Sequence, residues 1–114
     1  MQTCVFCGVA KKEVPADIVY EDEDLLAIRD VNPQAPVHLL IMPKAHVASI
    51  LECSGGDEVL IGKAVLLAAR LAAANGVAEG GFRLVCNTNR NAGQSVPHIH
   101  IHLLGGRPMK WPPG

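Results

Sequence analysis

The alternation of hydrophobic and polar positions divides the chain into short elements that are separated by proline, glycine and acidic turns. Two apolar segments, 17–21 and 25–30, flank an acidic turn and predict a β-hairpin. A third apolar segment, 37–42, lies between prolines and predicts another strand. Segments 81–87 and 96–104 predict two further strands on either side of a polar loop. The pattern therefore predicts five strands.

The longest uninterrupted pattern covers residues 57–75, where alanine and leucine dominate and Gly76 follows the end. This composition predicts one long helix. The helix has more apolar side chains than one buried face needs, namely Val59, Leu60, Leu66, Leu67 and Leu71. We expect part of this excess to lie against a second subunit. Strands that do not alternate regularly with helices favour an α+β fold with a mainly antiparallel sheet.

Length and charge narrow the class of protein. The 114 residues, 49% of them hydrophobic, suit a single domain that spans residues 1–114. The formal net charge is −1 and no run of like charge occurs, so we expect neither a nucleic-acid nor a membrane partner. The chain has no stretch with the length of a signal peptide core or a membrane span, which predicts a cytoplasmic location.

The segment HIHIHLL places three histidines at alternate positions, His98, His100 and His102. In a strand, these side chains would share one face. Such a face can be merely solvated, it can bind a metal ion, or it can supply a nucleophile. A neutral imidazole has a free lone pair, and neighbouring imidazoles discourage its protonation. The surroundings favour the nucleophile, with His100 attacking phosphorus and its neighbours and His38 stabilising the phosphoryl oxygens.

The four cysteines fall into a close pair and two isolated residues. Cys4 and Cys7 form a CxxC motif in an N-terminal segment, 1–16, which is typical of a metal site or of reduced thiols rather than of a secreted disulfide framework. Cys53 and Cys86 stand alone, and we expect both to be inert buried thiols.

Several segments together resemble the histidine-triad (HIT) family, in which three histidines alternate with apolar residues. HIHIHLL matches that pattern, and RDVNPQAPVHLLIMPKAH, NTNRNAGQSVPHIHIHLLGG and GGRPMKWPPG are similar to the Hint branch of purine nucleoside phosphoramidases. The resemblance covers residues 5–114. It implies a HIT-like fold with a five-stranded sheet, one long helix and a short N-terminal helix, and a sheet that is extended across a homodimer. The interface would involve helix 57–75 and strand 81–87.

The resemblance also implies roles for particular residues. His100 would be the nucleophile, with His38, His98, His102 and Ser95 around the α-phosphate. Asp30 would accept hydrogen bonds from the ribose hydroxyls. The remaining nucleotide-binding residues implied by the resemblance are Phe6, Val9, Val14, Ile28, Arg29, Val31, Asn87, Gly93, Gln94 and Trp111. Trp111 lies in a C-terminal tail, residues 105–114, which would contribute to substrate selectivity from the neighbouring subunit. Arg29 stands where the family often has histidine.

Many bacterial members of the family bind zinc through a CxxC pair. The resemblance implies a structural zinc ion held by Cys4, Cys7, His46 and His98, a set of ligands that suits tetrahedral coordination. The chemistry itself would require no cofactor.

The predicted activity is hydrolysis of the P–N bond of purine nucleoside 5′-phosphoramidates, or of conjugates that resemble aminoacyl adenylates, through a nucleotidyl-histidine intermediate that releases AMP or GMP. Two alternatives remain open. One is cleavage of dinucleoside polyphosphates, as in the Fhit branch. The other is a nucleotide-binding interaction module whose turnover is incidental.

Overall fold

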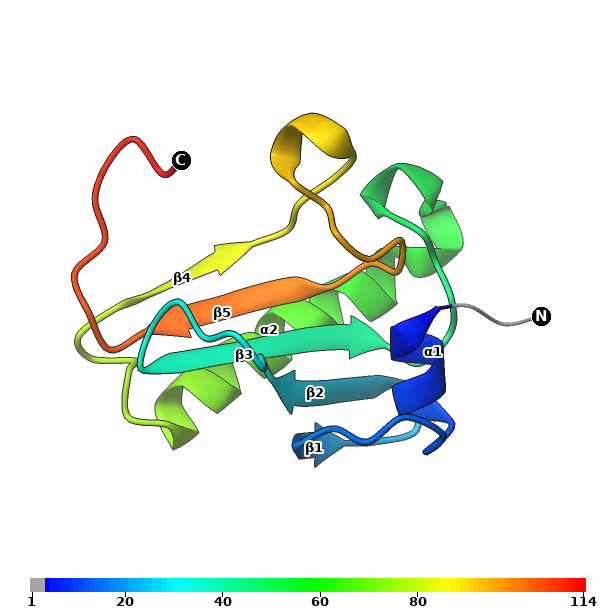
Figure 1. The fold of residues 1–114 in the computed structure, drawn as a ribbon, viewed down its shortest axis with the longest axis horizontal. Helices are drawn as coiled ribbons and strands as arrows, with labels where there is room; N and C mark the ends of the chain where they lie inside the picture. Colours follow the sequence, from blue (N-terminus) through cyan, green and yellow to red (C-terminus); the bar gives the residue numbers. More distant parts are fainter. Residues whose placement is uncertain (1–3) are drawn as a thin grey trace.

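The computed structural model describes residues 4–114, which form one antiparallel five-stranded sheet with helices on both faces (Figure 1). The order of the strands in the sheet is β1-β2-β3-β5-β4. The strands are β1 (Ile18–Glu21), β2 (Leu25–Arg29), β3 (Val37–Pro43), β4 (Phe82–Val85) and β5 (Ile101–Gly105). The helices are α1 (Val5–Ala10) and α2 (Glu58–Ala74), with short 3-10 turns η1 (Ile50–Glu52), η2 (Gly55–Asp57) and η3 (Arg90–Ala92). The expected α+β fold, with one long helix and a short N-terminal helix, is confirmed.

The two helices bury opposite faces of the sheet, and each face has its own core. The α2 side packs Leu67 and Ala68 against alternate strand residues such as Leu39 and Leu103. On the other side, α1 covers Leu26, Ile28, Leu40 and Met42 with Phe6 and Val9. Because both faces are covered, β3 is apolar almost throughout its length.

The last predicted strand, 96–104, is wrong in its first half, because β5 begins only at Ile101. Pro97 has no N–H to donate to a ladder. The N–H of His98 turns back to the carbonyl of Val96 (2.9 Å), and that of Ile99 donates to the carbonyl of Val47. His98 and His100 therefore lie in a bent segment that leads into the strand. With no β5 partner there, β4 also ends before the predicted residues 86–87.

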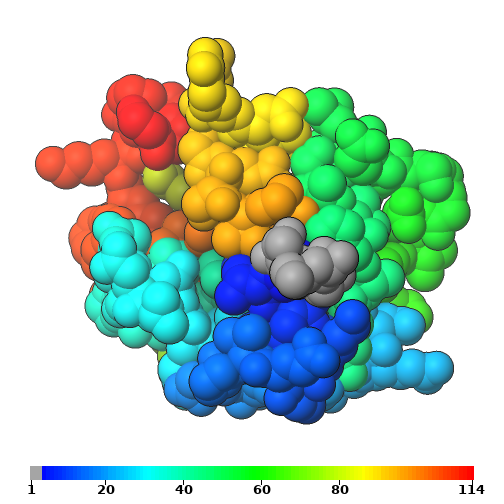
Figure 2. Space-filling model, turned by 45° about the vertical axis from the view of Figure 1, so that its right-hand side comes forward, coloured from blue at the N-terminus to red at the C-terminus, as the bar shows by residue number. Residues whose placement is uncertain are grey.

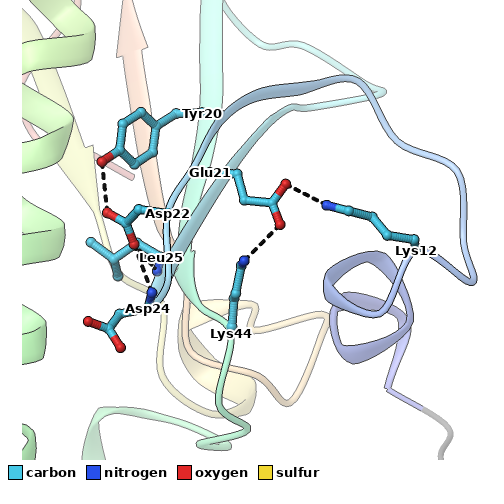
Figure 3. A network of polar contacts seen from close by, with 7 residues as sticks. All are labelled: Lys12, Tyr20, Glu21, Asp22, Asp24, Leu25 and Lys44. Carbon is cyan, nitrogen blue, oxygen red and sulfur yellow. Dashed lines mark hydrogen bonds and ion pairs between the residues drawn. The ribbon is translucent and has the colours of Figure 1, made fainter.

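An ionic network fixes the chain between α1 and the sheet (Figure 3). The Glu21 carboxylate in β1 forms ion pairs with Lys12, which follows α1, and with Lys44, which follows β3 (2.7 Å). Next to it, the Tyr20 hydroxyl donates to Asp22 (2.7 Å), and Asp22 accepts two backbone N–H groups in the β1–β2 turn. The Lys12–Glu21 ion pair joins the segment after α1 to β1, and this segment continues into one wall of the site described below.

No helix within residues 4–114 is long and apolar enough to cross a bilayer.

Candidate active site

A cavity of about 300 Å³ opens on the α1 side of the sheet, next to the histidines. Helix α1 and the residues after it form one wall, the end of β2 forms another, and the segment before β5 forms the third. Many of the predicted site residues line this cavity: Phe6, Val9, Val14, Ile28, Arg29, Asp30, Val31, Ser95, His100 and His102. Its apolar walls and a few polar groups suit a nucleoside-sized ligand.

His100 is almost fully buried and has a defined tautomer. Its Nδ1–H donates to the backbone carbonyl of His98 (2.8 Å), because a carbonyl can only accept. The ring packs edge-on against Phe6, with centroids 5.1 Å apart. The neutral ring therefore has its lone pair on Nε2. A histidine that is held in this way at the wall of a cavity can act as a nucleophile.

His38 and His102 form a directional chain of hydrogen bonds. The backbone N–H of Gln34 donates to Nδ1 of His38 (3.0 Å), so the proton of neutral His38 is on Nε2. That Nε2–H donates to Nδ1 of His102 (2.9 Å), and also lies 3.3 Å from the Asp30 carboxylate. His102 must then carry its own proton on Nε2. This N–H is left to donate to another group.

The surroundings of these rings disfavour protonation. Burial, together with the neighbouring His100 and His38, lowers the pKa of His102 to about 4. Burial also lowers the pKa of His38, although the Asp30 carboxylate opposes the effect. Both rings are therefore neutral near pH 7, as their chain of hydrogen bonds requires.

Asp30 follows β2 and its carboxylate is mostly shielded from solvent. One oxygen accepts the N–H of Asn32 (2.8 Å) and the other faces His38. Each carboxylate oxygen can accept more than one hydrogen bond, so acceptor positions remain available at the cavity wall. This placement allows the predicted ribose contact.

The structure places four predicted nucleotide-binding residues outside this cavity. Asn87 lies beside a second cavity near the C-terminal tail, and Trp111 is 82% exposed. Gly93 uses its N–H in the η3 turn. The Gln94 side chain holds the loop together: its amide donates to the carbonyls of Ala48 (2.7 Å) and Val96 (3.0 Å) and accepts the N–H of Asn89 (2.9 Å). Gly93 and Gln94 thus shape the loop that carries Ser95.

A second cluster, behind the cavity, brings together Cys4, Cys7, His46 and His98, whose ligand atoms all lie within 4.8 Å of one another. The Sγ atoms of Cys4 and Cys7 lie 3.3 and 3.6 Å from Nδ1 of His98, and Cys7 Sγ lies 3.3 Å from Nδ1 of His46. Tetrahedral zinc with ordinary bond lengths separates sulfur from nitrogen by about 3.6 Å. The four residues could therefore hold a metal ion.

Hydrogen bonds around this cluster also fit metal binding. Nε2–H of buried His98 donates to the carbonyl of Pro43 (2.7 Å), which leaves the Nδ1 lone pair directed at the sulfurs. The N–H of Cys7 donates to Cys4 Sγ (3.4 Å), as is common for a ligating thiolate. Burial and the Cys4 thiol raise the pKa of Cys7, so a cation would be needed to stabilise its thiolate.

The expectation that Cys53 and Cys86 are buried is wrong, because Cys53 is only half-buried and Cys86 is exposed.

A third group, Asp30, His38 and His102, is also close enough to chelate an ion. However, the N–H of Gln34 donates to Nδ1 of His38, which fixes the proton on the Nε2 atom that would have to bind. This group is therefore better suited to hydrogen bonding than to metal coordination.

Sequence reasoning missed some contributors to the site. Gln34 acts through its backbone, and Pro43 through its carbonyl, so neither offers a side-chain signal. Pro15, Ala16 and Leu40 complete the cavity as ordinary apolar residues.

The fold and the site define a class of small α+β proteins with a nucleoside-sized cavity beside buried histidines. A family model described as "HIT domain" matches residues 11–109. The chain is 46% identical to the purine nucleoside phosphoramidase of Escherichia coli over 105 residues, which are 92% of this chain and 88% of that protein. It is 50% identical to a HIT-like protein of Synechococcus elongatus over 96% of both chains. This chain thus belongs to the histidine-triad family.

Solved structures agree with this assignment. A HIT family hydrolase from Legionella pneumophila superimposes with a TM-score of 0.96 at 52% identity, covering 98% of this chain and all of the other. A HIT family hydrolase from Clostridium thermocellum gives 0.93 at 44% identity, covering 96% of each chain. The chain is therefore related over nearly its whole length to HIT family hydrolases.

Proposed function

We propose that this protein hydrolyses purine nucleoside 5′-phosphoramidates, and also conjugates that resemble aminoacyl adenylates, and releases AMP or GMP. The observation that carries the proposal is the tautomer of His100, whose Nδ1–H bond to the His98 carbonyl leaves the Nε2 lone pair unprotonated. The 46% identity to a protein described as a purine nucleoside phosphoramidase supports the choice of substrate.

The reaction would proceed in two displacements. First, Nε2 of His100 attacks the α-phosphorus and the P–N bond to the leaving group breaks, giving a nucleotidyl-histidine and an amine. The leaving nitrogen takes up a proton through the hydroxyl of Ser95, which also lines the cavity. Water then attacks the same phosphorus, and the bond between phosphorus and Nε2 of His100 breaks. The proton that water loses replaces the one that Ser95 passed to the leaving nitrogen, and the nucleoside monophosphate is released. His100 regains its lone pair.

The neighbouring residues would stabilise charge and orient the substrate. The outward Nε2–H of His102, which is fixed by the chain from Gln34 through His38, donates to a phosphoryl oxygen. Asp30 accepts from the ribose hydroxyls. Phe6, Val9 and Ile28 surround the purine.

We also propose that the Cys4, Cys7, His46 and His98 cluster holds a structural zinc ion. The donor set and the separations between its atoms support this. The bound ion would stabilise the thiolates and tie α1 to the catalytic segment. It would take no part in the displacements, because His98 uses both ring nitrogens elsewhere.

A homodimer is the third part of the proposal. Strand β4 is at the edge of the sheet, and Phe82 is partly exposed there. Val59 and Leu66 expose about 70% of their surface on α2. Pairing of two copies through β4 and α2 would cover both features and extend the sheet.

Steady-state hydrolysis of a fluorogenic adenosine 5′-phosphoramidate, measured beside diadenosine polyphosphates, tests the activity. We expect efficient turnover of the phosphoramidate. His100→Ala should abolish turnover, by a factor of at least about 10³, but retain binding of AMP, since the base and ribose contacts remain. Preferential cleavage of the polyphosphate, or loss of AMP affinity that matches the loss of rate, would contradict the proposal.

A further inference from the structure

A second cavity, of about 460 Å³, lies on the same face of the sheet as the histidines. His38 and His102 form part of its wall, and the C-terminal tail forms the opposite wall. In the sheet, Val85 pairs with His102 and Arg83 pairs with Leu104, so Arg83 and Val85 share the face of His102. Figure 2 shows the hollow between the red tail and the orange segment that precedes β5.

This cavity lies where a leaving group would emerge. His100 lines the nucleoside cavity only, whereas His102 lines both cavities. Phosphoryl transfer is roughly in line, so the leaving group departs on the side of phosphorus opposite the nucleophile. With His100 as nucleophile, as the proposed function requires, we expect the leaving group to pass His102, which lines the second cavity as well.

The lining of the second cavity is cationic. It includes Arg83, Arg107 and Lys110, and no Asp or Glu side chain contributes to it. The guanidinium groups donate to carbonyls of Lys110, Gln34 and Pro108, which fixes them without neutralising their charge. None of the three cations takes part in an ion pair found within residues 4–114. The side chains of the lining therefore have a net positive charge.

We propose that this cavity receives the leaving group and selects one that bears a negative charge, such as an amino acid joined to the α-phosphorus through its nitrogen. Arginine and lysine recognise carboxylate and phosphate through charge-assisted hydrogen bonds. The cavity would recognise the negative charge of the leaving group, which a carboxylate or a phosphate chain can supply.

The test compares AMP joined through nitrogen to glycine with AMP joined to glycinamide, two substrates that differ chiefly in one charge. The intrinsic reactivity of the two substrates is the same for every enzyme variant. The informative quantity is therefore the ratio of kcat/KM for the glycine conjugate to kcat/KM for the glycinamide conjugate, compared between variants. Lys110→Glu should lower the glycine-to-glycinamide ratio about tenfold, the scale of a charge-assisted contact. Lys110 is exposed, and its backbone carbonyl rather than its ammonium group bonds to Arg83.

Two further variants make the test specific. Arg83→Met should lower the ratio in the same direction, whereas Arg83→Lys should retain most of it. Lys11→Glu makes the same charge reversal at an exposed position that lines neither cavity, and it should leave the ratio unchanged. A diadenosine polyphosphate tests the other source of the anion. Preferential cleavage of this substrate, with the largest loss in Lys110→Glu, would show that a phosphate chain occupies the cavity, and it would contradict the proposed phosphoramidase function.

The outcomes separate the two proposals. If the wild-type protein cleaves none of the conjugates, the proposed function fails, and this inference fails with it. If it cleaves both nitrogen-linked substrates but the ratio is the same in wild type, Lys110→Glu and Arg83→Met, only the inference is overturned.

Discussion

Each histidine of the site has its own hydrogen-bond partners, and these partners decide which nitrogen carries a proton. A backbone carbonyl beside Nδ1 of His100 requires a donor there, and a backbone N–H beside Nδ1 of His38 requires an acceptor. Identical side chains thus acquire opposite tautomers. The nucleophilic role proposed for His100 and the hydrogen-bonding role proposed for His38 rest on backbone groups two and four residues away in the sequence.

Asp30 provides a prediction at this scale. Asp30→Ala should weaken productive binding of ribonucleotide substrates by about 1 to 3 kcal/mol in kcat/KM, since charge-assisted hydrogen bonds to the ribose hydroxyls are lost. A 2′,3′-dideoxy substrate is the matched control, because it lacks those hydroxyls and should be nearly indifferent to the substitution. Equal losses on both substrates would remove Asp30 from ribose recognition.

His102 predicts how stability depends on pH. Its pKa of about 4 in the folded state lies below the ordinary value of 6.5, so between these values the unfolded chain binds a proton that the folded chain does not. The free energy of unfolding should therefore fall as the pH drops from about 6.5 towards 4. The lowered pKa values of His38 and His98 act in the same direction.

Urea denaturation at pH 7, 6 and 5 measures this dependence. The slope of the free energy of unfolding against pH is proportional to the number of protons that the unfolded chain binds in excess of the folded chain. His102→Gln should reduce this number by up to one. An unchanged slope would show that His102 is not kept neutral by the fold.

At the scale of elements, α1 depends on the cluster that it brings to the sheet. It has only six residues, too few to be stable alone, and Cys4 caps it by accepting the N–H of Cys7. If the cluster holds zinc, Cys4→Ser should reduce the metal content from near one ion per chain and lower the Tm by about 5 °C or more. Cys53→Ser, outside the cluster, should change neither quantity. If the wild-type protein has the same Tm without metal as with it, the zinc proposal is contradicted.

The sequence predicted elements where the local pattern determines the structure, and failed where distant residues do. The strands at 25–30 and 37–42 and the helix at 57–75 come within one or two residues of those observed, because their apolar spacing matches the faces that they bury. Residues 96–100 have the alternation of a strand, but Pro97 and the competing carbonyl of Val47 divert them.

The site was predictable to a similar extent. The histidine spacing and the family resemblance indicated most of the residues that line the nucleoside cavity. The spacing did not indicate that His98 faces the cysteines, because that depends on a carbonyl from the end of β3. The cationic cavity was not predicted either, since its arginines and lysine are spread over β4 and the C-terminal tail.

At the scale of the whole molecule, the exposed edge of β4 and the outer surface of α2 predict the assembly. Sedimentation equilibrium should give a mass of two chains at micromolar concentration. Leu66→Glu would place a charge in the interface and should raise the dissociation constant at least about tenfold. Leu51→Glu is the matched control, because Leu51 is exposed to a similar degree, 69% against 67%, but lies on η1. A monomeric wild-type protein with full activity would refute the homodimer.

The three alternating histidines of this chain do not share one role, because His98 belongs to the cysteine cluster. Its two nitrogens face Pro43 and the cysteine cluster, so it has no donor or lone pair to offer a substrate. The imidazoles that can meet a phosphate are His100, His102 and, through His102, His38. The cysteine cluster and the phosphate-facing histidines are therefore linked by the backbone between His98 and His100 and by Phe6, whose ring packs against both imidazoles. A redesign of the cysteine site must keep the His98 carbonyl in place, because that atom, rather than the ring, sets the tautomer of His100, the proposed nucleophile.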